Sequence, residues 1–392
     1  MLGDGLAHEL KRLLPNRPPI AIAFSGGGDS TALLHALRDR AAVALIVDHC
    51  ITPGSAERTA LAESRALAMG VRSIVLKPKS SPLKTSQSAA RALRYTLMGE
   101  ACRNLGIANL LTAHTMDDIA ELAVMRAARN PSDYGTMPAL SHAPVWPGLY
   151  GIDIVRPLRL WRRSVLRDYL KTHTLRWIDD PANADSNYER VRVRRSCPII
   201  TQDDIQKEDV ARRRCAKSIA TDSKRLRFQE GWVEAPINLS PDTLELASRC
   251  ASGAKHRGLS EPKTATGGGA HILRRGNTLL LTSDPGAVFG RDGVAALSPI
   301  ALSPRNDTLW GERFVIAAHS SDLHVEPLGT RWPEGHPKPH ITVRRTLPGV
   351  FRSDRLIAIP GWGEVSIRYL AEERFKRTLA STLRPVNEIT VT

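Results

Sequence analysis

The feature that most restricts the fold of this chain is a glycine-rich loop that lies between a short apolar run and a segment whose apolar residues recur at helical spacing. Residues 20–24 form an apolar run, and residues 31–37 carry apolar side chains at helical spacing, so the loop Ser25-Gly26-Gly27-Gly28-Asp29-Ser30 joins a predicted strand to a predicted helix. Consecutive glycines let backbone N–H groups converge on an anion, and the N-terminus of the helix adds a favourable dipole. The loop lacks the Gly-Lys-Ser/Thr ending of a Walker A motif. The sequence therefore predicts a phosphate-binding loop, but not transfer of a terminal phosphoryl group.

The rest of the N-terminal half alternates between the two kinds of element. Further strands are predicted at residues 43–47, 71–76 and 109–113, and further helices at 56–69, 86–105 and 117–128. This alternation is typical of an α/β domain with a parallel sheet and helices on both faces, whose ligand sites lie at the carboxyl ends of strands. Residues 130–151 are rich in Pro and Gly, which predicts a loop.

The length of 392 residues suggests two or three domains. We expect a domain at residues 1–200 that carries the phosphate-binding loop, a basic linker and middle region at 201–300, and a small C-terminal domain of uncertain fold at 301–392; ATP binding and catalysis in the first part and tRNA contact in the second are implied by a resemblance of the motifs to a known family. Beyond residue 230, short apolar runs predict strands at 278–282, 313–318 and 356–359. Gly267-Gly268-Gly269 has no strand-then-helix context and is interpreted as a turn.

The charge of the chain points to a polyanionic partner. The formal net charge is +15, and residues 156–227 hold 19 Lys or Arg against 10 Asp or Glu, a net +9 within this stretch. A field of this sign attracts nucleic acid and speeds its association. Nucleic acid is therefore the first partner to consider.

Other classes of protein are disfavoured by composition. No stretch approaches the roughly 20 apolar residues that cross a bilayer, so we expect no membrane partner. Residues 1–17 lack the apolar core and cleavage site of a signal peptide, which predicts a cytoplasmic location. The five cysteines are odd in number and scattered, which disfavours a disulfide framework and a paired-cysteine metal site.

A second segment that bears chemistry is His114-Thr115-Met116-Asp117-Asp118-Ile119-Ala120-Glu121. On a helix, Asp117 and Glu121 share one face because they are four apart, whereas Asp118 points about a third of a turn away. Clustered carboxylates hold either Mg²⁺ or an ammonium group, and both alternatives stay open.

Smaller segments extend the pattern. Arg156-Pro157-Leu158 precedes a Pro/Asn/Asp-rich stretch, 177–190, that ends in Arg190, and guanidinium binds phosphate oxygens in a two-pronged fashion. Asp48 and His49 end the second predicted strand, and Ala90-Arg91-x-x-Arg94-Tyr95 lies on a predicted helix.

These segments resemble those of the PP-loop ATP pyrophosphatases, and among them the chain is most similar to the tRNA(Ile)-lysidine synthetase family. The resemblance covers about residues 18–198. It implies a ligase that uses ATP and Mg²⁺ to adenylate the C2 oxygen of the wobble cytidine in the CAU anticodon of tRNA(Ile), with release of pyrophosphate. Free L-lysine then displaces AMP. The oligomeric state is not implied.

At the positions of this sequence that match the family's motifs, the resemblance implies an ATP site, a lysine site and a Mg²⁺ site, with some residues in more than one of them. The ATP site comprises Ser25, Gly26, Gly27, Gly28, Asp29, Ser30, Asp48, His49 and His114. Lysine is expected at Asp117 and Glu121, Mg²⁺ at Asp29 or Asp117, and catalytic roles at Asp29, Asp117, Glu121 and Arg190. Spacing alone does not assign the individual carboxylates.

Two rival interpretations remain. The first is a tRNA thiolating enzyme of the same superfamily, although the chain contains no Cys-x-x-Cys. The second is a catalytically inactive RNA-binding relative, which the intact loop and carboxylates argue against.

Overall fold

The structure is a computed structural model that describes residues 2–50, 54–78, 87–129, 137–142, 147–179, 192–193, 200–253, 258–291 and 295–383. The chain forms two compact units, Met1–Arg213 and Arg214–Leu383. The three-part division expected from the sequence stays a prediction.

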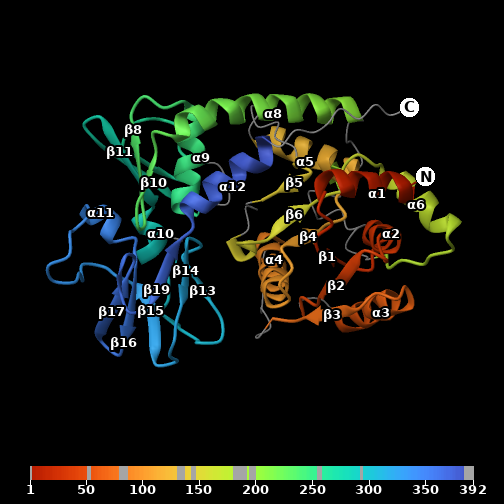
Figure 1. Ribbon diagram of the computed structural model, residues 1–392, viewed down its shortest axis with the longest axis horizontal. Coiled ribbons are helices and arrows are strands. Elements are labelled where there is room, and N and C mark those ends of the chain that lie inside the picture. The colour runs from red at the N-terminus through yellow and green to blue at the C-terminus, as the bar shows by residue number, and fades with distance from the viewer. Residues whose placement is uncertain are drawn as a thin grey trace. The chain divides into compact units, whose positions relative to one another are not determined.

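Unit 1 contains one six-stranded sheet in the order β3-β2-β1-β4-β6-β5 (Figure 1). Its strands are β1 (Ile20–Ala23), β2 (Ala41–Val47), β3 (Ser73–Leu76), β4 (Asn109–Leu111), β5 (Leu140–Ser141) and β6 (Asp153–Val155). All neighbouring strands pair in parallel except β5, which runs antiparallel to β6. The predicted parallel α/β sheet is therefore confirmed.

One part of the sequence prediction for this sheet is wrong. The segment 130–151 was predicted as a loop, but it contains β5 and a 3₁₀ turn at Pro147–Leu149; residues 130–136 and 143–146 lie outside the described residues. A two-residue edge strand forms by pairing with β6, which lies more than ten residues later, so it leaves no local periodicity to detect.

The helices of unit 1 are α1 (Leu2–Leu13), α2 (Gly28–Ala36), α3 (Ser55–Ala68), α4 (Gln87–Asn104), α5 (Met116–Arg129) and α6 (Arg163–Thr172). A longer helix, α8 (Gln202–Ser223), begins in this unit. The predicted helices α2 to α5 are confirmed within a few residues at their ends. Helices α1, α6 and α8 were not predicted.

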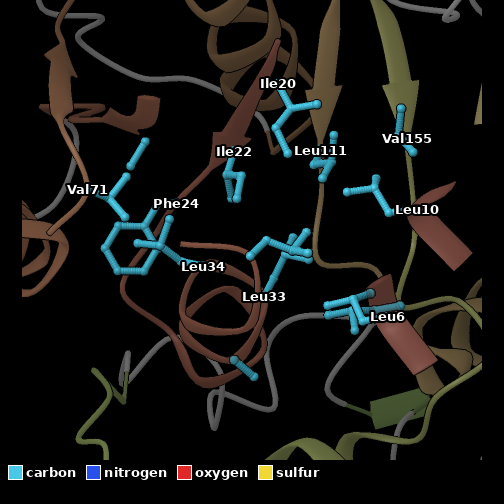
Figure 2. Close-up of a cluster of buried hydrophobic side chains, with 14 of the residues drawn as sticks. Leu6, Leu10, Ile20, Ile22, Phe24, Leu33, Leu34, Val71, Leu111 and Val155 are labelled. Atoms are coloured by element: carbon cyan, nitrogen blue, oxygen red, sulfur yellow. The ribbon is translucent and has the colours of Figure 1, made fainter. Parts of the chain in front are cut away.

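Helices cover both faces of the sheet, because successive side chains of its strands point to opposite faces and are buried on both. Ile20 and Ile22 of β1 pack with Leu33 and Leu34 of α2, together with α1, as Figure 2 shows. Ala21, between them, belongs to a second buried cluster that includes residues of α4. Successive side chains of a strand point to opposite faces. Because β2 and β4 both pair in parallel with β1, the carboxyl ends of the three strands lie at the same edge of the sheet.

Unit 2 is built mainly from antiparallel sheets. One has the order β7-β8-β11-β10-β9, a second β12-β15-β16-β17-β18 and a third β13-β14-β19. The first consists of β7 (Arg227–Phe228), β8 (Val233–Pro236), β9 (Ala265–Gly267), β10 (Ala270–Arg275) and β11 (Thr278–Ser283). The second consists of β12 (Ile300–Ala301), β15 (Leu323–Pro327), β16 (Pro348–Arg352), β17 (Arg355–Ile359) and β18 (Trp362–Gly363), and the third of β13 (Thr308–Trp310), β14 (Phe314–Ala317) and β19 (Ser366–Tyr369).

The helices of unit 2 are α9 (Pro241–Ser252), α10 (Pro285–Phe289), α11 (Ile341–Arg344) and α12 (Ala371–Leu383). The three strands predicted beyond residue 230 are confirmed as β11, β14 and β17. Gly268 and Gly269 have positive φ angles between β9 and β10, which confirms the predicted turn. None of the described helices combines the length and the hydrophobicity needed to cross a lipid bilayer.

Candidate active site

The predicted phosphate loop connects β1 to α2 and is held by hydrogen bonds. Gly26 has a φ of +74°, a conformation that favours glycine, and its carbonyl accepts from the backbone N–H of Ile178 at 2.8 Å. A Cβ atom on Gly26 would lie 2.6 Å from Ile178 Cδ1. The Ser30 hydroxyl donates to the Gly27 carbonyl at 2.9 Å, and the Thr31 hydroxyl bonds the Gly26 carbonyl at 3.1 Å. The loop is thus shaped before any phosphate binds.

Arg167 of α6 lies against this loop. A Cβ atom on Gly28 would lie 1.9 Å from Arg167 Nη1, so a larger residue there would push this guanidinium out of its position. The guanidinium stacks on the Trp177 ring at 4.6 Å, and its buried Nη1 has no hydrogen-bond partner among the described residues. A cation near a helix N-terminus is unfavourable unless an anion joins it. Arg167 therefore offers an unused donor where the loop would receive a phosphate.

The predicted carboxylates meet at Arg163, the first residue of α6. Its Nε donates to Asp29 at 3.0 Å, its Nη2 to Asp118 at 3.1 Å and its Nη1 to Glu121 at 3.3 Å. Its backbone N–H donates to Asp117 at 2.7 Å. The structure thus brings Asp29, on the phosphate loop, together with the acidic segment of α5.

Asp118 also binds this guanidinium. On α5 it lies about a third of a turn from Asp117, as expected, and it is a neighbour of Glu121, three residues later, on the helix surface, so both bind Arg163. Its other carboxylate oxygen accepts from the backbone and hydroxyl of Thr115, while its N–H lies 3.4 Å from that hydroxyl. This reciprocal pair is a capping box, which begins α5 and holds Asp118 facing the site.

Only one of the two carboxylate oxygens of Asp29 has a hydrogen-bond partner among the described residues. Burial raises its pKa, against the lowering effect of Arg163, and the Asp118 charge raises it further. Asp29 Oδ1 is buried and has no partner among the described residues. An acceptor of this kind suits Mg²⁺. Within the described part of the chain, however, no three His, Cys, Asp or Glu side chains are grouped as metal ligands, so Mg²⁺ binding stays a prediction.

Asp48 and His49 lie at the end of β2, as expected. Asp48 is buried, and although burial raises its pKa, hydrogen bonds from the Ser55 hydroxyl and the Cys50 N–H outweigh this effect, so its pKa is lowered. Burial and nearby Arg94 lower the pKa of His49, whose Nδ1 has no partner among the described residues. A neutral His49 therefore has an unused nitrogen at the strand end where the nucleotide base is expected.

His114 follows β4 and lies between two polar partners. Its Nε2 is 3.3 Å from Arg91 Nη2, and its Nδ1 is 2.8 Å from the Thr112 hydroxyl. Because arginine only donates, Nε2 accepts in this arrangement and Nδ1 carries the proton. Tyr95, on the same helix as Arg91, is buried in the core.

The arginines of the third predicted segment have different environments. Arg156 is buried and donates to the Pro138 carbonyl and the Ser141 hydroxyl, so it holds the edge strand β5. Arg190 and the rest of 180–190 lie outside the described residues, and its expected role stays a prediction.

Sequence reasoning missed Arg163 and Arg167 as site residues. Arg163 is 134 positions from Asp29, so no spacing links them. Their separation of four residues is the only available signal, because it places both side chains on one face of a helix. That signal required α6 to be recognised.

The PP-loop domain family matches residues 5–199. A tRNA(Ile)-lysidine synthase of Caulobacter vibrioides is 32% identical over 82% of this chain and 79% of the relative. One from Hyphomonas neptunium is 38% identical, over 48% of this chain and 54% of the relative. Among solved structures, a U34-tRNA thiolase of Methanococcus maripaludis is similar with a TM-score of 0.41 and 14% identity, over 49% of this chain and 71% of that chain.

A parallel sheet whose first strand ends in this loop defines an ATP-binding protein of the PP-loop class. Within that class, the chain belongs to the tRNA(Ile)-lysidine synthase family, the synthetases indicated by its motifs.

Proposed function

We propose that this protein ligates lysine to C2 of the wobble cytidine in the CAU anticodon of tRNA(Ile), in the cytoplasm. ATP first adenylates the C2 oxygen with release of pyrophosphate, and the lysine amine then displaces AMP. Family membership supports tRNA as the substrate. The observation that supports the proposal is that Asp29 of the phosphate loop and two carboxylates of α5 meet at one guanidinium, because a nucleotide bound by the loop would then lie beside an amine bound by those carboxylates.

ATP and lysine bind to different parts of the site. The loop residues Ser25–Ser30 and Arg167 hold the ATP phosphates, with Asp48, His49 and His114 on the nucleotide side. Asp117, Asp118 and Glu121 bind the lysine ammonium. Arg190 neutralises pyrophosphate. Asp29 and Asp117 would hold Mg²⁺, which supplies charge neutralisation to the phosphates.

The amine must lose a proton before it attacks. An unperturbed lysine ε-amine has a pKa of about 10.4, so it is protonated at neutral pH. Glu121 is almost fully buried and lies within reach of the site's cation, which suits a carboxylate that first pairs with the ammonium and then accepts its proton.

The cysteines argue against the thiolating alternative. Burial raises the pKa of Cys102 to about 12 and that of Cys250 to about 11, and the pKa values of Cys50 and Cys215 are also raised. Sulfur transfer uses a thiolate, which a raised pKa disfavours. Cys197 lies outside the described residues.

The deciding experiment is mass analysis of tRNA(Ile) after incubation with ATP and isotope-labelled lysine. We expect one lysine per tRNA, on the wobble cytidine, with stoichiometric pyrophosphate. Glu121→Gln should raise the KM for lysine, because it removes a charge that pairs with the ammonium. If sulfur enters tRNA and lysine does not, the thiolating alternative replaces this proposal.

A further inference from the structure

The cation already present in the carboxylate cluster is part of the protein. Arg163 binds Asp29, Asp118 and Glu121 through three different nitrogens, at 3.0, 3.1 and 3.3 Å. Its backbone N–H binds Asp117. One residue therefore engages all four of the carboxylates from the loop and from α5 that surround it.

At Asp118 and Glu121, this arrangement leaves little room for a second cation. The side chains of Glu121 and Asp118 are only 2% and 10% exposed with the guanidinium in place. Three carboxylates share one positive charge here, which is unfavourable because each buried negative charge needs a cationic or hydrogen-bonding partner.

A lysine ammonium offers the cluster the same charge in another form. It is a compact point charge with three donors, whereas guanidinium is a planar fork. Either cation satisfies Asp118 and Glu121, but their low exposure prevents both from doing so at once. Binding of one must therefore displace the other.

We propose that Arg163 is an internal counter-ion that the substrate lysine displaces from Asp118 and Glu121, and that it thereby sets the affinity for lysine. This inference rests on the proposed function and adds a positioning residue to it. When lysine is absent, the Arg163 guanidinium pairs with Asp118 and Glu121. When lysine enters, the arginine side chain rotates away while its backbone N–H stays on Asp117.

Competition of this kind has a measurable cost in affinity. The apparent Kd equals the intrinsic Kd divided by the fraction of molecules in which the pocket is open. If the guanidinium leaves the pocket about one tenth of the time, removing it should tighten lysine binding about tenfold. A residue with only a structural role would weaken binding when removed.

The test is calorimetric titration of the full-length protein with L-lysine, comparing wild type with Arg163→Ala and Arg163→Lys. We expect the Kd to fall about tenfold in Arg163→Ala if the open fraction is about one tenth. Arg163→Lys should be intermediate, because an ammonium cannot bridge three carboxylates as the fork does. The lysine-free Arg163→Ala protein should melt at a lower temperature, and added lysine should raise its melting temperature more than that of wild type.

Lys171→Ala is the matched control. It removes the same charge from α6, but Lys171 is 70% exposed and pairs only loosely with Asp168, at 3.8 Å. Its lysine Kd should match wild type, and equal tightening in this variant would overturn the proposal. Unchanged or weaker binding in folded Arg163→Ala and Arg163→Lys would also overturn it.

Two failures can be told apart. If labelled lysine enters tRNA with wild type but Arg163→Ala binds lysine no more tightly, only this inference fails. If wild type incorporates no lysine, the proposed function fails and the inference falls with it.

Discussion

At the scale of the residue, Asp29 belongs to the candidate site, and its ionised form lowers the stability of the folded protein at neutral pH. Its pKa is raised, so the folded protein holds this proton more tightly than the unfolded chain does. The contribution of this protonated carboxyl to the free energy of unfolding is therefore present at low pH, and it is lost as the pH rises through the raised pKa of Asp29. We predict that Asp29→Asn is more stable than wild type at pH 7, with a difference that shrinks toward pH 4, while pyrophosphate release falls about 10²-fold or more. Thermal melts across this pH range and a pyrophosphate assay measure both effects.

Asp168→Asn is the control for this prediction, because Asp168 is exposed on α6 and the change in charge is identical. It should leave both stability and turnover unchanged. A lower melting temperature of Asp29→Asn at pH 7 would mean that the bond to Arg163 outweighs burial.

The cysteines provide a second prediction at this scale. Replacing Cys50, Cys102, Cys197, Cys215 and Cys250 by Ser or Ala should leave lysine-dependent modification of tRNA largely intact, because the described thiols have raised pKa values. The buried pair, Cys102 and Cys250, should account for any loss of stability. Labelled-lysine transfer measures activity, and a folded but inactive variant would favour thiolation.

At the scale of the element, one ion pair holds helix α8 to the turn before α6. Arg159 binds Asp209 through two nitrogens, at 2.7 and 3.2 Å, and its side chain is only 4% exposed. Removing one partner of a buried pair leaves an uncompensated charge, which costs about 3–5 kcal/mol. We predict a loss of this order for Asp209→Asn in urea unfolding.

Asp203→Asn is the matched control, because it makes the same substitution at an exposed position in the same helix. It should cost less than about 1 kcal/mol, the contribution of an acidic residue at a helix N-terminus. Equal losses in the two variants would show that the ion pair contributes no more than a surface charge.

At the scale of the whole molecule, the net charge of +15 should govern tRNA binding. Arg212 pairs with Glu208 at 2.7 Å, which makes it a poorer choice for a phosphate contact than its neighbours. We predict that neutralising Arg213, Arg214 and Lys217 together weakens tRNA binding and flattens its salt dependence. Each lost contact should lower the slope by about 0.9 for duplex and 0.7 for single strands. Filter binding over a range of salt measures the slope.

A variant that neutralises Arg275, Arg305 and Lys338 removes the same charge from exposed positions outside the basic stretch 156–227. An unchanged slope in this control would localise the contact to the basic stretch. Equal flattening in both variants would mean that the overall field, and no particular surface, attracts tRNA.

The sequence by itself determined the phosphate loop, the alternating strands and helices from β1 to α5, and the acidic segment of α5. Each of these depends on local chemistry: glycines permit the tight loop, and periods of 2 and 3.6 residues identify the elements. The turn at Gly268 and Gly269 was predictable for the same reason. These features need only neighbours along the chain.

Only the tertiary structure decided which charges meet. Arg163 reaches Asp29 across 134 positions, and Arg167 reaches Gly28 only because α6 packs beside α2. Strand β5 exists because β6 offers it hydrogen bonds. Asp118 faces the site because its capping box with Thr115 orients it and Arg163 supplies the opposite charge. Contacts of this kind depend on how distant segments pack, and spacing along a single chain does not record that packing.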